Sequence, residues 1–235
     1  LMKLEEEFGS GAIDFADIYK YPTPVLLAER LRAGEQPENA LVALNYDGIR
    51  ELMKVSTPPG GMKTKTLGNV LLTGATGYLG VHILLDLLSR KNICGKISCL
   101  VRGKKKLSAE KRIKNALYYY GEQDFSESCG EKWQIVEGDM TQPGIFTEPF
   151  NEEINCVINA AANVAHFAHD DSLESVNTDG VKRLITFCQK NNAAFYQIST
   201  ISVAGAFPAG KSVPPFTEED LFIGQEIHNA YVLSK

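Results

Sequence analysis

From Asn69 onward, apolar and polar positions follow two alternating patterns. Short apolar runs, each long enough for one buried strand, are separated by stretches whose apolar residues recur on one helix face, as Val81, Leu84 and Leu88 do. This alternation predicts a parallel sheet with helices on both faces. The expected strands are Asn69–Thr73, Lys96–Val101, Trp133–Glu137, Asn155–Ala160 and Ala194–Ser199, and the expected helices are Leu79–Arg90, Ser108–Tyr120 and Ser172–Asn191.

Right-handed crossovers would place these strands in the order 3-2-1-4-5, which is a doubly wound α/β fold of the Rossmann type. Residues 1–33 lack this alternation, and their pattern predicts a small helical unit. There Thr23 is the expected N-cap of a helix that begins at Pro24. Residues 34–68 are rich in Gly, Pro, Lys and Thr, so we interpret them as a connector to the main domain at residues 69–235.

Composition limits the classes of function. The chain has 235 residues, 44% of them hydrophobic, and a net charge of -5, as expected of a soluble protein with a substantial core. Neither a bilayer-length apolar run nor a signal peptide is evident, so we expect a cytoplasmic protein that is not a membrane protein. The mild acidity argues against a nucleic-acid partner.

No metal site is expected. The chain has 5 cysteines, an odd number without metal-ligand spacing, which indicates reduced thiols. His166 and His169 form a His-x-x-His pair, but the sequence offers no further ligands at compatible spacing.

The segment Val70–Gly80 carries the strongest chemical signal. An apolar strand runs into Gly74, Gly77 and Gly80, and a helix follows directly. Gly74 would permit the tight turn, Gly77 would let the backbone approach a pyrophosphate, and Gly80 would let helix and strand pack closely. The helix N-terminus adds free N–H groups and a positive dipole end for an anion.

The end of the second strand favours NADPH. NAD sites place an acidic residue about twenty residues beyond the glycines, where it binds the ribose hydroxyls. Here that position is Arg102, whose guanidinium suits a phosphate, and Arg112 on the next helix is a second, weaker candidate. We interpret the lysines at 104–106 as a solvated loop.

A candidate catalytic group follows the fifth strand. Tyr231 and Lys235 are spaced to share one helix face, so the lysine charge would favour the phenolate form of Tyr231. Tyr231 could then give a proton to a developing alkoxide, while Thr200, at the strand end, would hydrogen-bond the same oxygen.

The glycine segment Thr73–Gly80 resembles the extended short-chain dehydrogenase/reductase superfamily. With Leu100–Arg102, Gly138-Asp139, Asn159–Ala162, Ile198–Gly205 and Tyr231–Lys235, the chain resembles terminal thioester reductase domains of nonribosomal peptide synthetases. It is also similar to carboxylic acid and aminoadipate-semialdehyde reductases. The resemblance implies that NADPH reduces a carrier-bound thioester to an aldehyde, and in some members onward to an alcohol. The implied cofactor-binding residues are Gly74, Thr76, Gly77, Tyr78, Leu79, Gly80, Arg102, Arg112, Asp139, Met140, Ala160, Ala161, Ala162, Tyr231 and Lys235.

Residues 1–33 contain Leu4–Gly9 and Ile18–Pro24, which resemble the end of a peptidyl-carrier (thiolation) domain. This resemblance implies an upstream carrier and synthetase as partners, and a phosphopantetheine arm whose serine is not in this chain. Family members continue beyond the position of Lys235 into a substrate region. We therefore expect that the chain as it stands does not turn over, and that at most weak NADPH binding survives.

Two alternatives remain open at this stage. One is an NAD-dependent sugar-nucleotide epimerase or dehydratase of the same superfamily. The other is a non-enzymatic fragment that binds a cofactor as a scaffold.

Overall fold

The computed structural model describes part of the chain. Residues 34–65, which form most of the expected connector, and His166, His169 and His228 lie outside the described residues. The described ranges are 6–9, 13, 17, 21, 23–33, 66–90, 93–104, 106–121, 128–147, 150, 152–165, 171–207, 215–217, 220, 222–227 and 230–235.

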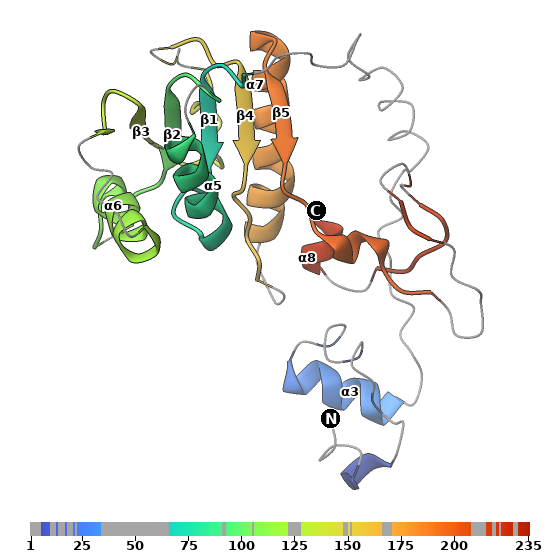
Figure 1. The fold of residues 1–235 in the computed structure, drawn as a ribbon. Helices are drawn as coiled ribbons and strands as arrows, with labels where there is room; N and C mark the ends of the chain where they lie inside the picture. Colours follow the sequence, from blue (N-terminus) through green and yellow to red (C-terminus); the bar gives the residue numbers. More distant parts are fainter. Residues whose placement is uncertain are drawn as a thin grey trace.

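The centre of the molecule is a five-stranded parallel sheet in the order β3-β2-β1-β4-β5, which confirms the predicted topology (Figure 1). Each strand agrees with the sequence prediction to within two residues. The apolar runs of β1, β2 and β4 are the buried centre of the sheet, whereas β3 and β5 at its edges are only partly buried. The strands are β1 (Val70–Thr73), β2 (Ile97–Val101), β3 (Trp133–Glu137), β4 (Cys156–Asn159) and β5 (Ala194–Gln197).

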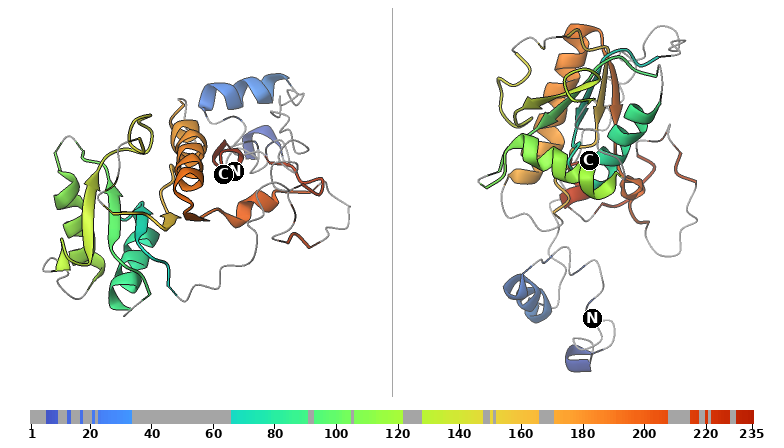
Figure 2. Two further views of the ribbon diagram at one scale, coloured as in Figure 1. Left: turned by 90° about the horizontal axis from the view of Figure 1, so that it is seen from above. Right: turned by 60° about the vertical axis from the view of Figure 1, so that its left-hand side comes forward.

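Helices cover both faces of the sheet (Figure 2). On one face α5 (Tyr78–Ser89) and α6 (Ala109–Tyr120) bury an apolar cluster that includes Val70 and Leu72. On the opposite face α7 (Val181–Asn191) packs on a second cluster that includes Leu71. Side chains of a strand point alternately to its two faces, so successive residues of β1 enter different cores.

Two helices begin with a side-chain cap, and the cap at Thr23 confirms its prediction. The hydroxyl of Ser108 accepts a hydrogen bond from the backbone N–H of Lys111 at 3.3 Å, which caps α6. Thr23 accepts one from the N–H of Leu26 at 3.2 Å, and α3 (Pro24–Ala33) begins at the following proline. Both interactions satisfy a backbone donor that has no partner within the helix.

The expected helix at 172–191 contains a π-helical segment, η2 (Glu174–Gly180), which continues directly into α7. Periodicity alone does not separate π from α geometry over so short a stretch. The segment places the buried side chain of Asn177 toward the loop that follows β4, where it hydrogen-bonds Asn163.

The N-terminal helix α3 lies apart from the sheet in both views (Figures 1 and 2). It is tied to the preceding segment by an ion pair of 3.4 Å between Arg30 and the buried Asp17. Among the described residues, no helix has the length and apolar character needed to cross a membrane.

Candidate cofactor pocket and active site

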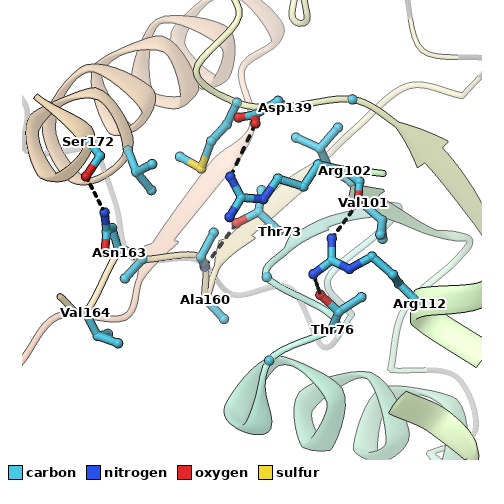
Figure 3. A pocket seen from close by; sticks show the side chains of 18 residues that line it. Thr73, Thr76, Val101, Arg102, Arg112, Asp139, Ala160, Asn163, Val164 and Ser172 are labelled. Atoms are coloured by element: carbon cyan, nitrogen blue, oxygen red, sulfur yellow. Dashed lines mark hydrogen bonds and ion pairs between the residues drawn. The ribbon is translucent and has the colours of Figure 1, made fainter. Parts of the chain in front are cut away.

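A pocket of about 540 Å³ opens at the carboxyl ends of β1, β2, β3 and β4 (Figure 3). This edge, where the strand order reverses between β1 and β4, is where doubly wound sheets bind nucleotides. The lining combines the glycine turn, two arginines, an aspartate and the loop after β4. Its residues are Thr73, Gly74, Thr76, Gly77, Leu100, Val101, Arg102, Arg112, Gly138, Asp139, Met140, Ala160, Ala161, Ala162, Asn163, Val164, Ser172 and Val176.

The three glycines of the turn meet different steric demands. Gly74 has a φ of +74°, and a Cβ there would come within 2.5 Å of the Ala160 and Ala161 backbone. A Cβ at Gly80 would lie 2.1 Å from the carbonyl oxygen of Gly74, so helix and turn touch directly. At Gly77 the nearest atom is 3.3 Å away, and this glycine lines the pocket at the N-terminus of α5. The turn therefore offers a bare helix terminus on which a pyrophosphate fits.

Two guanidinium groups stand at the end of β2. Arg112 donates from one nitrogen to the carbonyl oxygen of Arg102 and from the other to the Thr76 hydroxyl at 3.0 Å. Burial, followed by the neighbouring Arg102 charge, lowers the pKa of Arg112. Arg112 thus links α6, β2 and the glycine turn (Figure 3), and places a second positive charge beside Arg102.

The Arg102 side chain is 57% exposed and pairs with Asp139 at 3.5 Å. Burial raises the pKa of Asp139, but the hydrogen bonds from Thr141 and the Arg102 charge outweigh it and hold that pKa below its usual value. Because exposed ion pairs contribute little net stability, Arg102 can exchange Asp139 for a phosphate at small cost.

A second hollow of about 660 Å³ adjoins the first, and the two share Arg102 and Asp139. Lys104 and Lys106 line it together with Leu107. These lysines, which the sequence suggested were simply solvated, add positive charge next to the arginine.

The predicted catalytic residues lie around the end of β5. The Lys235 ammonium donates to the carbonyl oxygen of Ile198 at 2.7 Å, and burial lowers the pKa of Lys235. Tyr231 belongs to α8 (Ala230–Leu233), which packs against η3 (Ile201–Ala204), and Thr200 is the N-cap of η3. The fold thus gathers the three residues near one strand end, although none of them is among those that line the pocket.

The comparisons agree with this geometry. Residues 72–235 match the family of NAD-binding domains described as male sterility protein. The chain belongs to this family. A solved thiolation-reductase di-domain from an archaeal nonribosomal peptide synthetase is 35% identical, with a TM-score of 0.75, over 100% of this chain and 50% of that one.

Curated relatives of the family also match. An isonitrile lipopeptide synthase of Streptomyces coeruleorubidus is 26% identical over 86% of this chain and 15% of its own length. The L-2-aminoadipate reductase large subunit of Penicillium chrysogenum is 34% identical over 53% of this chain and 9% of its own length. These likenesses confirm the resemblance to terminal reductase domains. The chain spans only a small part of both curated relatives.

Within this family fold, ten of the predicted cofactor-binding residues line the pocket. They are Gly74, Thr76, Gly77, Arg102, Arg112, Asp139, Met140, Ala160, Ala161 and Ala162. Gly80 acts instead through helix packing. Tyr78 and Leu79 are largely exposed beside the turn, and the Tyr78 ring makes edge contacts with His82 and Tyr120.

Sequence reasoning missed Asn163, Val164, Ser172 and Val176 of the lining. Asn163 follows the alanines directly, and its amide donates to the Ser172 hydroxyl at 2.9 Å. The position of Asn163, just beyond the end of a strand, was the feature of the sequence that could have indicated a pocket residue. Within the described residues, no group of three or more His, Cys, Asp or Glu side chains could hold a metal ion.

Proposed function

We propose that this protein is an NADPH-dependent reductase that releases an acyl or peptidyl group from a carrier thioester as an aldehyde. One observation carries the proposal: a glycine-turn pocket with Arg102 at the end of β2 lies in the same fold as a Tyr-x-x-x-Lys turn held at the end of β5. The likeness to a thiolation-reductase di-domain supports it.

The pocket residues fit the proposed cofactor. The pyrophosphate would bind at Gly77 and the N-terminus of α5, and the 2′-phosphate at Arg102, with Arg112 and Lys106 nearby. Asp139 would accept a hydrogen bond from the adenine amino group, and the small side chains of Ala160–Ala162 would leave room for the nicotinamide half. When bound, NADPH supplies a hydride to the thioester carbonyl carbon.

The chain's own residues would bind and protonate the oxygen of that carbonyl. Thr200 would hydrogen-bond and orient it, and Tyr231 would give it a proton as negative charge develops. Lys235 would favour proton release from Tyr231 and would bind the ribose. The resulting hemithioacetal loses its carrier thiol as the C–S bond breaks, which leaves the aldehyde. A second round on the aldehyde would give an alcohol.

Residues 1–33 are proposed to be the end of the carrier domain that delivers the substrate on its phosphopantetheine arm, with 34–68 as connector. The archaeal di-domain, whose likeness extends over all of this chain, supports this arrangement. The likeness to an aminoadipate reductase supports a closely related alternative, reduction of a carrier-bound amino acid instead of a peptide.

The test uses the full-length natural protein, an acyl thioester on a carrier phosphopantetheine, and NADPH absorbance with aldehyde trapping. Tyr231→Phe keeps the ring and removes the proton donor, so kcat should fall about 100- to 10,000-fold. Tyr119→Phe is the matched control, because Tyr119 lies 78% exposed on α6. Parental activity in Tyr231→Phe would refute the assigned role.

A further inference from the structure

The hydroxyl of Ser234 makes two hydrogen bonds beside the proposed catalytic tyrosine. It donates to the backbone carbonyl of Tyr231 at 2.6 Å and accepts from the side-chain amide of Asn177 at 2.8 Å. A serine hydroxyl commonly bonds a carbonyl one turn back. The second bond is different, because it joins residues 57 positions apart.

Asn177 is only 5% exposed, and its amide group is fully used. Its oxygen accepts from the N–H of Asn163 at 2.8 Å, and its nitrogen donates to the carbonyl oxygen of Asn163, also at 2.8 Å. Asn163 lines the cofactor pocket. A continuous path of hydrogen bonds therefore runs from the pocket wall through Asn177 and Ser234 to Tyr231.

The helix that carries Tyr231 needs such an anchor. α8 has 4 residues, about one turn, and helices that short are not stable without packing partners. Its anchors include the packing against η3, the buried Val232, the bond from Lys235 to Ile198, and the contacts of Ser234 with η2. The contacts of Ser234 include a bond of 3.4 Å from the Thr178 hydroxyl to its carbonyl oxygen.

We propose that Ser234 is a positioning residue, whose hydroxyl fixes Tyr231 and Lys235 relative to the pocket wall through Asn177. This inference rests on the proposed roles of Tyr231 and Lys235. Ser234→Ala removes both hydroxyl bonds and lets the one-turn helix shift. Since a misplacement of about 1 Å can cost on the order of 100-fold, kcat should fall about 10- to 100-fold. NADPH affinity should fall much less than kcat, because Gly77 and Arg102, which would hold the phosphates, are not among the described hydrogen-bond partners of Ser234.

The experiment measures kcat, KM, NADPH affinity and the pH profile of kcat in the full-length natural protein. The variants are Ser234→Ala, Ser234→Thr, Asn177→Ala and the Ser234→Ala/Asn177→Ala double variant. Threonine keeps the hydroxyl and should restore most of the rate. If Ser234 acts through Asn177, then Ser234→Ala should cause little further loss in the Asn177→Ala background. Ser89→Ala is the matched control, since Ser89 is an exposed helix-end serine bonded to a backbone carbonyl.

Three results would overturn the inference: a parental kcat in Ser234→Ala, no recovery in Ser234→Thr, or additive losses in the double variant. If Asn177→Ala does not fold, the Ala and Thr variants at position 234 decide the question. Tyr231→Phe is assayed in parallel. Full activity in Tyr231→Phe contradicts the proposed function, whereas an inactive Tyr231→Phe beside a fully active Ser234→Ala contradicts the positioning role alone.

Discussion

Arg102 and Arg112 have different tasks although they stand side by side. Arg112 is engaged with a carbonyl and a hydroxyl, so its charge is fixed in place. Arg102 is exposed, and among the described residues its side chain forms a loose ion pair with Asp139 at 3.5 Å. A fixed charge beside an adjustable one would suit the proposed recognition and release of a phosphate.

Arg102→Ala should weaken NADPH binding about 10- to 100-fold and change NADH binding little, because a charge-assisted phosphate contact contributes on the order of 1.5–3 kcal/mol. Titration with both cofactors measures this. Arg90→Ala is the control, since the Arg90 side chain is also 57% exposed and paired with a carboxylate, Asp86, on α5. Equal affinities of the unmutated protein for NADPH and NADH would contradict the prediction.

At Gly80 the glycine turn leaves no space for a side chain. A Cβ there would lie 2.1 Å from the Gly74 carbonyl oxygen, which is backbone and cannot move aside cheaply. Gly80→Ala should therefore lower the free energy of unfolding by about 1–3 kcal/mol and weaken cofactor binding. Urea denaturation checks the stability change. Gly144→Ala should have little effect, because its nearest neighbour is a side-chain oxygen 3.8 Å away.

At the scale of elements, the carboxyl ends of three neighbouring strands are joined by side chains. Thr73 of β1 donates to Asn159 of β4, and Asn159 donates to Gln197 of β5 at 2.8 Å. Gln197 in turn donates at 3.2 Å to the carbonyl of Ile198, which also accepts from Lys235. This row of side chains is buried at Thr73 and Asn159 and half-buried at Gln197, and it fixes the strand ends on which both the glycine turn and the lysine depend.

Asn159→Ala should lower the free energy of unfolding by about 2–4 kcal/mol, because Thr73 and Gln197 each lose a partner in a poorly solvated place. Thermal or urea unfolding measures the change. Asn191→Ala removes a half-buried bond from an exposed side chain to the Phe187 carbonyl near the end of α7, and is expected to cost less than about 1 kcal/mol. A similar cost for both variants would mean that the buried row contributes no special stability.

Elements that depend on local pattern were predictable. The five strands, their order, and the caps at Ser108 and Thr23 follow from apolar runs, crossover handedness and short-range capping. The glycine turn was predictable because a strand, a spaced glycine set and an amphipathic helix occur within twenty residues.

What depends on long-range contact was not predictable. Asn177 sits in a stretch whose periodicity is that of a plain helix, and only the folded chain brings it to Asn163 and Ser234. Similarly, Lys106 became part of a hollow because the loop after β2 returns beside Asp139. Side-chain hydrogen bonds between distant residues leave no periodic trace in the sequence.

At the scale of the whole molecule, the sheet separates two cores, and both contain thiols. Cys99 and Cys156 lie in the core under α5 and α6, and Cys188, a residue of α7, lies in the core between α7 and the sheet. All 3 are buried and free. Burial raises the pKa of each: Cys156 reaches about 12 and Cys188 about 11, against an ordinary value of 9.0, and Cys99 is raised further.

These thiols predict a loss of stability in alkaline solution. In the unfolded chain they ionise near their ordinary pKa of 9.0, whereas in the folded chain they stay protonated. Above that pH the folded state therefore binds more protons than the unfolded state, so the free energy of unfolding falls as pH rises toward 11 and 12. Below about pH 9 the thiols leave stability unchanged with pH. Lys235, whose pKa is lowered, acts in the opposite sense over part of this range.

The thiol contribution is isolated by comparing the natural protein with Cys188→Ala in urea denaturation at a series of pH values. Cys188→Ala loses packing at every pH, but it removes one titrating group. Its stability should therefore decline less steeply above pH 9 than that of the natural protein, and the two curves should converge. Parallel curves from neutral pH to pH 11 would show that Cys188 ionises equally in both states, and that its burial does not protect the thiol.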